Sequence, residues 1–223
     1  LRCLVGSEMC IRDRVFSPAR SGRDGTLKHT LENIYETREV VINVVTYDMV
    51  QQTSLSSTAY PKGVNEFVKA GFTPLDSVLV EPLRVKESPV HFECHVDDVV
   101  ELGDKGGAGN LVICQIAMVH ADEDMLNDKG IIDSKKLGLV GRMGGNYYCH
   151  ASEDVIFEVE KPIANMGIGI DKLPESIRNS AILSGNDLGQ LGNFESLPTA
   201  SETASTVSYT HLRAHETSEK RVC

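Results

Sequence analysis

Stretches of β-branched and aliphatic residues alternate with turn residues along the chain, and this pattern predicts a mainly β protein with short helices. The Gly-rich residues 103–109 favour a hairpin between two of the strands. A further strand over residues 139–149 is expected to be broken by Gly144 and Gly145. The remaining strands are expected at residues 15–16, 40–45, 77–85, 90–102 and 110–120.

Apolar residues at helical spacing predict a first helix that ends before the strand at residue 40, with Thr26 as its N-cap. Two shorter helices are expected over residues 48–56 and 64–70, with the loop 57–63 between them, and a late helix over residues 174–183.

The composition is that of a globular protein, with 41% hydrophobic and 24% charged residues. A formal net charge of -10 opposes sequence-independent binding to nucleic acid or to an anionic membrane. No apolar run reaches the roughly 20 residues that span a bilayer, and the N-terminus lacks the order of a signal peptide. We therefore expect a cytoplasmic protein.

The two ends of the chain are related at the level of DNA. One choice of codons for residues 5–13 is the reverse complement of codons for residues 207–215, which resembles the transposon-end adaptor of sequencing libraries. We interpret residues 1–14 and 207–223 as adaptor-derived tails. The remaining domain, residues 15–206, then begins inside a strand and is expected to lack its N-terminal portion.

Between these tails, Cys94, Cys114 and Cys149 form an odd, widely spaced set without a CxxC motif. This spacing predicts free thiols that are buried or half-buried, with neither a disulfide framework nor a zinc site. The Gly-rich residues 106–109 are followed by a strand, so the dinucleotide-binding fingerprint fails.

Two further groups resemble metal ligands only loosely. In HFECH, His91, Glu93 and His95 share one face of a strand, and we expect a polar, solvent-facing surface there. An acidic loop lacks the spacing of a calcium site and is expected to be solvated. Its acidic residues are Asp122, Glu123, Asp124 and Asp128.

The segment 17–30, SPARSGRDGTLKHT, is basic in an acidic chain, with Arg20, Arg23 and Lys28 against Asp24. Hydroxyl groups, basic side chains and the free amides of a helix N-terminus together suit a phosphate dianion. A solvated basic loop is the alternative that these residues leave open.

Several longer motifs occur in an order that resembles the flavoredoxin-type branch of the flavin reductase family, the FMN-binding split barrels. The resemblance covers essentially residues 15–197, and the family's segment before SPAR is absent. The motifs are SPAR, KHTLENI, VVINVVTYDMVQQ, STAYPKGVNEFVKAGF, VKESPVHFEC, GGAGNLVIC, GRMGGNYY, GIGIDKLPESIRNS and LSGNDLGQLGN.

The resemblance implies a six-stranded antiparallel Greek-key barrel that forms a homodimer and binds FMN near the subunit interface. The phosphate of FMN would be held by Ser17, Arg20, Lys28 and Thr30. The loop residues Ser57, Thr58, Tyr60 and Lys62 would border the isoalloxazine or ribityl region. Arg142, Gly145 and Tyr148 would lie on the nicotinamide or acceptor side, although the glycines alone would also fit a bent strand.

The implied activity is an FMN-dependent oxidoreductase that uses NADH or NADPH to reduce flavin or a small acceptor. Hydride transfer to flavin needs positioning rather than an acid/base pair, so no catalytic residue is assigned. The alternative is a non-enzymatic, FMN-bound electron carrier that a partner protein reduces. No metal is expected.

Overall fold

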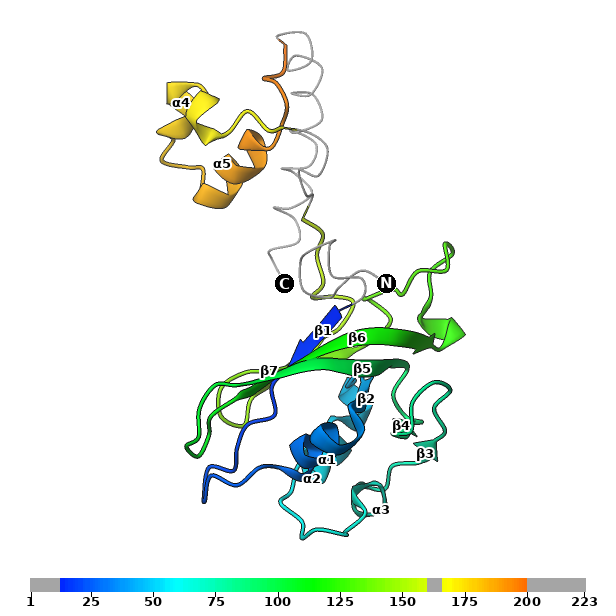
Figure 1. The fold of residues 1–223 in the computed structure, drawn as a ribbon. Helices are drawn as coiled ribbons and strands as arrows, with labels where there is room; N and C mark the ends of the chain where they lie inside the picture. The colour runs from blue at the N-terminus through cyan, green and yellow to red at the C-terminus, as the bar shows by residue number, and fades with distance from the viewer. Residues whose placement is uncertain (1–12, 160–165, 200–223) are drawn as a thin grey trace, which may run out of the picture. The chain divides into compact units, whose positions relative to one another are not determined.

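The computed structural model describes residues 13–159 and 166–199 (Figure 1). Contacts within the chain divide it into two compact units, Leu1–Phe157 and Glu158–Cys223. The predicted 15–206 domain is thus two contact units. Residues 1–12 and 207–223 of the predicted adaptor-derived tails lie outside the described residues.

An antiparallel four-stranded sheet forms the centre of the first unit. Its order is β1-β6-β5-β2, and the hairpin predicted through residues 103–109 is confirmed between β5 and β6. The strands are β1 (Asp13–Phe16), β2 (Glu39–Asn43), β5 (Val90–Glu101) and β6 (Asn110–Ala121).

Strand β1 corrects one predicted boundary. Asp13 and Arg14, which we placed in the N-terminal tail, pair with Gln115 and Cys114 of β6. The Arg14 guanidinium also lies 4.8 Å from the centre of the Phe92 ring. These two residues therefore belong to the folded sheet.

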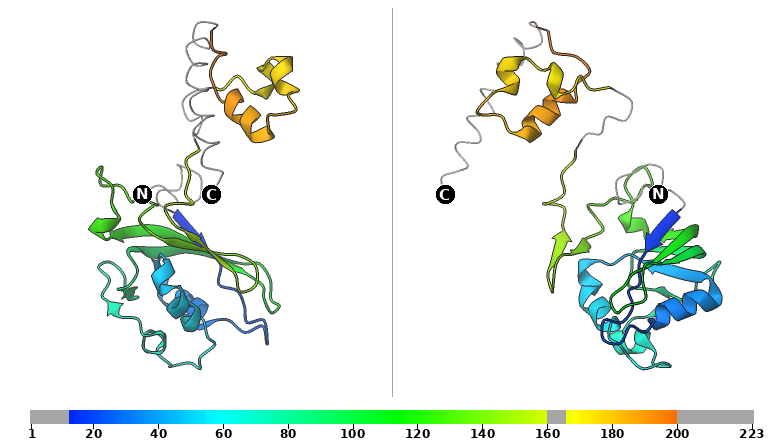
Figure 2. Two further views of the ribbon diagram at one scale, coloured as in Figure 1. Left: turned by 180° about the vertical axis from the view of Figure 1, so that it is seen from behind. Right: turned by 60° about the vertical axis from the view of Figure 1, so that its left-hand side comes forward.

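Helix α1 (His29–Thr37) lies beside the sheet (Figure 2). Its buried residues Leu31 and Ile34 pack into the main core, together with apolar residues of β2, β5 and β6. Its N-cap is Lys28 rather than the predicted Thr26. The difference has a local cause, because the Asp24 carboxylate accepts hydrogen bonds from the backbone and hydroxyl of Thr26.

The two short helices after β2 are confirmed. A 3-10 turn η1 (Tyr47–Met49) leads into α2 (Val50–Ser56), and α3 (Glu66–Ala70) follows. Asn65 caps α3 by accepting hydrogen bonds from the amides of Phe67 and Val68. None of the helices in the described ranges has the length and apolar character to cross a membrane.

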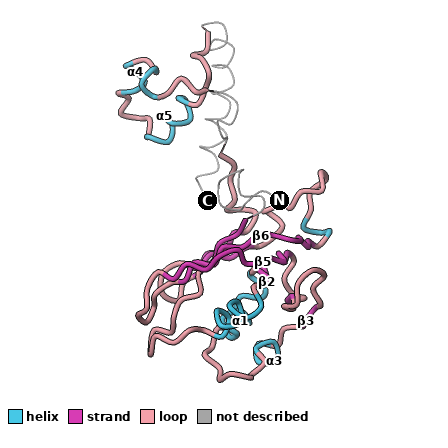
Figure 3. Tube along the Cα trace, viewed as in Figure 1, coloured by secondary structure: helices cyan, strands magenta, loops and turns pink. Residues whose placement is uncertain are grey.

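The strand predicted over residues 77–85 is wrong for most of its length. Of this range only β4 (Arg84–Val85) is a strand, which pairs with β3 (Pro74–Leu75) just before the range, and residues 77–83 are loop (Figure 3). The amides of Val78 and Leu79 bond to the Glu93 carboxylate instead of a neighbouring strand. The Glu93 carboxylate thus accepts the hydrogen bonds that a neighbouring strand would otherwise accept.

A two-stranded ribbon completes the first unit. Strands β7 (Leu139–Arg142) and β8 (Tyr148–Ala151) pair as a hairpin around the glycines, where a single strand broken by Gly144 and Gly145 was predicted. The acidic loop contains the 3-10 turn η2 (Glu123–Met125), and its acidic side chains are exposed as expected. In the described residues, the strands form three separate sheets rather than a closed six-stranded barrel.

The described part of the second unit contains η3 (Ile170–Lys172), α4 (Glu175–Arg178) and α5 (Gly185–Gly192). The helix predicted over residues 174–183 is only the short α4, and α5 was not predicted. A capping box, in which the Ser184 hydroxyl and the Asp187 carboxylate bond each other's backbone amides, starts α5.

Candidate functional site

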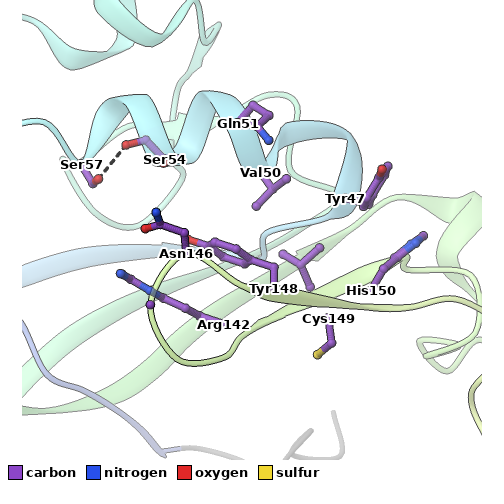
Figure 4. A pocket seen from close by; sticks show the side chains of 12 residues that line it. Tyr47, Val50, Gln51, Ser54, Ser57, Arg142, Asn146, Tyr148, Cys149 and His150 are labelled. Atoms are coloured by element: carbon purple, nitrogen blue, oxygen red, sulfur yellow. Dashed lines mark hydrogen bonds between the residues drawn. The ribbon is translucent and has the colours of Figure 1, made fainter.

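A pocket of about 460 Å³ lies between η1 and α2 on one side and the β7–β8 ribbon on the other (Figure 4). All of its lining residues belong to the first unit. They are Tyr47, Val50, Gln51, Ser54, Ser57, Val140, Arg142, Gly145, Asn146, Tyr148, Cys149 and His150.

The alternation of the ribbon decides which side chains share the pocket face. Arg142 pairs with Tyr148 and Val140 pairs with His150, two positions apart on each strand. Side chains at alternate positions of a strand point to the same face, so these four lie together. Cys149, at the intervening position, points away from Arg142 and His150 in Figure 4.

A tight turn joins the two strands. The amide of Met143 donates to the carbonyl of Tyr147 at 2.9 Å, and Gly145 has a φ of 61°. This left-handed conformation favours glycine. Gly145 therefore lets the ribbon return on itself beside the pocket.

Contacts with the chain around Tyr47 hold the ribbon opposite α2. Thr46 and Leu139 form an isolated antiparallel bridge, and the amide of Tyr47 donates to the carbonyl of Gly138 at 2.9 Å. The rings of Tyr47 and His150 stack with centroids 4.4 Å apart and an interplanar angle of 21°. An aromatic pair therefore spans one end of the pocket.

Four of the predicted site residues meet in this pocket. Ser57 comes from the end of α2, and Arg142, Gly145 and Tyr148 come from the ribbon. Thr58, Tyr60 and Lys62 belong to the loop after α2 and do not line the pocket.

The loop after α2 continues toward α1. The Lys62 ammonium lies 3.1 Å from the Glu32 carboxylate of α1, and the Tyr60 ring lies 5.7 Å from the ammonium group of Lys69. One loop therefore runs from the pocket at Ser57 to the first turn of α1, where Lys28 and Thr30 lie.

Among the predicted phosphate ligands, Arg20 is bonded within the protein. Its guanidinium donates to the Glu101 carboxylate at 2.8 Å and to the carbonyls of Gly103 and Gly25. The hydroxyl of Tyr35 and then the Arg20 guanidinium, both hydrogen-bonded to it, lower the pKa of Glu101. Arg20 thus ties the basic segment to the hairpin between β5 and β6.

The other three predicted phosphate ligands are exposed. Lys28 and Thr30 lie at the start of α1, and Ser17 follows β1. The side chains of these three residues make no hydrogen bond or ion pair in the described ranges, which leaves their polar groups accessible from solvent.

Sequence reasoning missed most of the α2 side of the pocket. Tyr47, Gln51 and Ser54 lie within or just after the quoted motif VVINVVTYDMVQQ, but nothing local distinguishes them from ordinary helix residues. His150 and Asn146 lie in or beside GRMGGNYY. The stacking of Tyr47 on His150 joins segments far apart in sequence, so only the structure identifies it.

The prediction that HFECH faces solvent is wrong for two of its residues. His91 is 4% exposed and Glu93 is 0% exposed, while His95 is exposed. Nε2 of His120 donates to Glu93 at 2.6 Å, and the amides of Val78 and Leu79 donate to the same carboxylate.

Burial raises the pKa of Glu93, but the hydrogen bonds from the Leu79 and Val78 amides and from His120 outweigh it, and the net pKa is lowered. Burial instead lowers the pKa of His91. No cluster of three or more metal-binding side chains occurs in the described residues. His91 and Glu93 of HFECH are therefore buried, hydrogen-bonded residues of the sheet.

The three cysteines between the predicted tails differ in burial. Cys94 and Cys114 are buried as predicted, and burial raises their pKa values to about 12 and about 11. Cys149 is exposed, contrary to expectation, because it lies on the ribbon. All three are free thiols.

Comparison with known proteins resolves the family. A family model described as "Flavin reductase like domain" matches residues 15–137, which is more than half of the chain. The chain belongs to this flavin reductase-like family. The match runs from β1 to the loop before β7, so it includes the α2 side of the pocket and ends before the ribbon.

An uncharacterized protein of Aquifex aeolicus (strain VF5) is 32% identical over 128 residues, which cover 57% of this chain and 63% of the relative. This chain spans slightly under two thirds of the length of the curated relatives it matches first.

Two solved structures are similar in fold. Nitrilotriacetate monooxygenase component B from Bacillus cereus has a TM-score of 0.59 and 26% identity, covering 66% of this chain and 71% of that one. A protein described as a flavin reductase with a split barrel domain, from Shewanella frigidimarina NCIMB 400, has a TM-score of 0.53 and 27% identity, covering 60% and 65%. The predicted fold class, a mainly β split-barrel protein with short helices, is confirmed.

Proposed function

We propose that this chain is an FMN-dependent oxidoreductase that uses NADH or NADPH to reduce flavin or a small acceptor. The observation that carries the proposal is the pocket, where Ser57 from the α2 side meets Arg142 and Tyr148 from the ribbon. Family membership supports flavin chemistry, and the pocket supplies a place for it.

The residues present fit a flavin. A cavity of about 460 Å³ lies within the range of about 300–1,000 Å³ that is typical of small-molecule sites. Its α2 wall offers the amide of Gln51 and the hydroxyl group of Ser54, which can bond the polar edge of an isoalloxazine ring. Tyr47 adds a partly exposed aromatic surface.

For the phosphate of FMN we propose Ser17, Lys28 and Thr30, with Arg20 holding the segment in place through Glu101. Lys28 supplies a positive charge and the N-terminus of the nine-residue helix α1 supplies free amides. The loop 57–63 connects this cluster with the pocket, so Thr58, Tyr60 and Lys62 would lie along the ribityl chain.

The reductant or acceptor would enter on the ribbon side, beside Arg142, Gly145 and Tyr148. When bound, flavin supplies the hydride acceptor, and the organic chemistry belongs to the cofactors. The residues of this chain would bind and orient the two molecules.

The test is the anaerobic absorbance of the chain with FMN after addition of NADH or of NADPH. We expect the yellow absorbance to bleach faster than in a control with free FMN, because the pocket brings the two molecules together. Bound flavin that stays yellow with both nicotinamides would favour the electron carrier instead. A chain that leaves FMN unbound would contradict both functions.

A homodimer and a cytoplasmic location stay predictions. Light scattering of the purified chain tests the first, and fractionation of the source cells tests the second. A monomer that binds FMN with full affinity would show that FMN binding does not depend on a subunit interface.

A further inference from the structure

The cation in the pocket is Arg142, which comes from strand β7 of the ribbon. Arg142 makes no hydrogen bond or ion pair with any part of the chain that the structure describes. Arg20, Arg38 and Arg84, in contrast, each donate hydrogen bonds to carbonyl or carboxylate oxygens. A guanidinium with free donors is suited to bind a carboxylate or phosphate in a bidentate manner.

The charge around Arg142 differs from that of the whole chain. The chain has a formal net charge of -10, yet the pocket lining contains no aspartate and no glutamate. Among the lining residues, Arg142 is the one with a permanent charge. An anion that enters this pocket therefore meets no lining carboxylate.

Aromatic surface lies beside this cation. Tyr148 is the cross-strand partner of Arg142 and is 44% exposed, and Tyr47 is 58% exposed although it stacks on His150. Exposed aromatic faces bind flat rings by offset stacking. The pocket thus combines a place for a ring with a place for an oxyanion.

We propose that the ribbon side of the pocket binds a planar aromatic molecule that carries an oxyanion, with Arg142 holding the oxyanion and Tyr148 the ring. The inference rests on the proposed function, because it defines the substrate class of the same site. Two sources share this chemistry: an aromatic carboxylate that accepts electrons, or the phosphate-bearing nicotinamide dinucleotide.

The experiment is equilibrium binding by calorimetry, with and without saturating FMN, using benzoate, uncharged benzamide and NAD⁺ as separate probes. Arg142→Gln removes the charge and keeps a polar side chain. Arg178→Gln, an exposed position in the second unit, is the matched control for loss of one positive charge. Binding does not require turnover, so this result is independent of the anaerobic assay.

We expect Arg142→Gln to weaken benzoate binding by about 10- to 150-fold, the usual loss for one charge-assisted hydrogen bond, and to leave benzamide binding unchanged. The same loss for NAD⁺ alone would support the oxyanion site and assign it to the reductant. Equal affinities for Arg142→Gln and Arg178→Gln with both anions, or no binding of either anion to the parent chain, would overturn the proposal.

Discussion

At the scale of single residues, Glu93 is a buried carboxylate that connects a loop to the sheet. Its carboxylate is fully buried and accepts hydrogen bonds from two loop amides and from His120, while Nε of Arg84 lies 3.9 Å away. A buried carboxylate is stable only with such partners. Glu93 therefore fixes the loop that follows β3.

We predict that Glu93→Gln destabilises the fold by roughly 2 kcal/mol at pH 7, because hydrogen bonds to a charged acceptor are lost. The pKa of Glu93 is below its ordinary value of about 4.3. Its stabilising contribution is therefore present above about pH 4.3 and is lost as pH falls through the lower, folded-state pKa. Urea denaturation at pH 7 and at acidic pH measures both effects.

Glu39→Gln is the control for this prediction. Glu39 is partly exposed and accepts a hydrogen bond from the amide of Glu81 in the same loop, so its replacement should cost less. The contradicting result is a Glu93→Gln variant that is as stable as the parent both at pH 7 and at acidic pH. The buried network would then contribute nothing to the free energy of unfolding.

The burial of Glu93 was beyond reach of the sequence. Its acidic character and its place in HFECH predict a solvent face, and its partners come from the loop after β3 and from β6. Only these long-range contacts show that the Glu93 side chain is buried and not exposed to solvent. The solvated acidic loop and the two buried cysteines needed no such contacts, and both were predicted correctly.

At the scale of elements, the ribbon positions half of the pocket, and its turn depends on one glycine. Gly145 has a φ of 61°, whereas Gly144 has no positive φ, and an added Cβ would meet no atom within 4 Å at either position. An alanine at either position would therefore meet no steric contact. A difference between the two variants reports the backbone strain at Gly145 alone.

Gly145→Ala should destabilise the chain by about 1 kcal/mol and weaken benzoate binding, because an L-residue resists the left-handed conformation. Gly144→Ala should leave both unchanged within error. Thermal unfolding and the same calorimetric titration provide the measurements. Identical behaviour of the two variants would mean that the turn does not hold Arg142 and Tyr148 in place.

Elements with a local signal were predictable, and those set by distant partners were not. The β5–β6 hairpin follows from two strand-like runs around a Gly-rich turn. The loop 77–83 has strand composition, but side-chain carboxylates take its amides. Helix α5 is rich in glycine, which lowers helix propensity, and its capping box from Ser184 to Asp187 was the signal that was overlooked.

At the scale of the whole molecule, the pocket joins segments that only the fold brings together. Motif resemblance found the ribbon residues and Ser57, and the structure adds Tyr47, Gln51 and His150. The family match and the similar structures agree with the predicted fold class. We propose that flavin binds in this pocket and that its phosphate binds at the basic segment.

The most direct test is titration of FMN by fluorescence quenching with the parent chain, Lys28→Ala and Arg23→Ala. Both side chains are exposed and basic, but only Lys28 lies at the N-terminus of α1. We predict that the parent chain quenches FMN, that Lys28→Ala weakens binding by about 10- to 150-fold through loss of a charge-assisted hydrogen bond, and that Arg23→Ala costs far less. Equal FMN affinities for Lys28→Ala and the parent, or no quenching by the parent, would contradict the account.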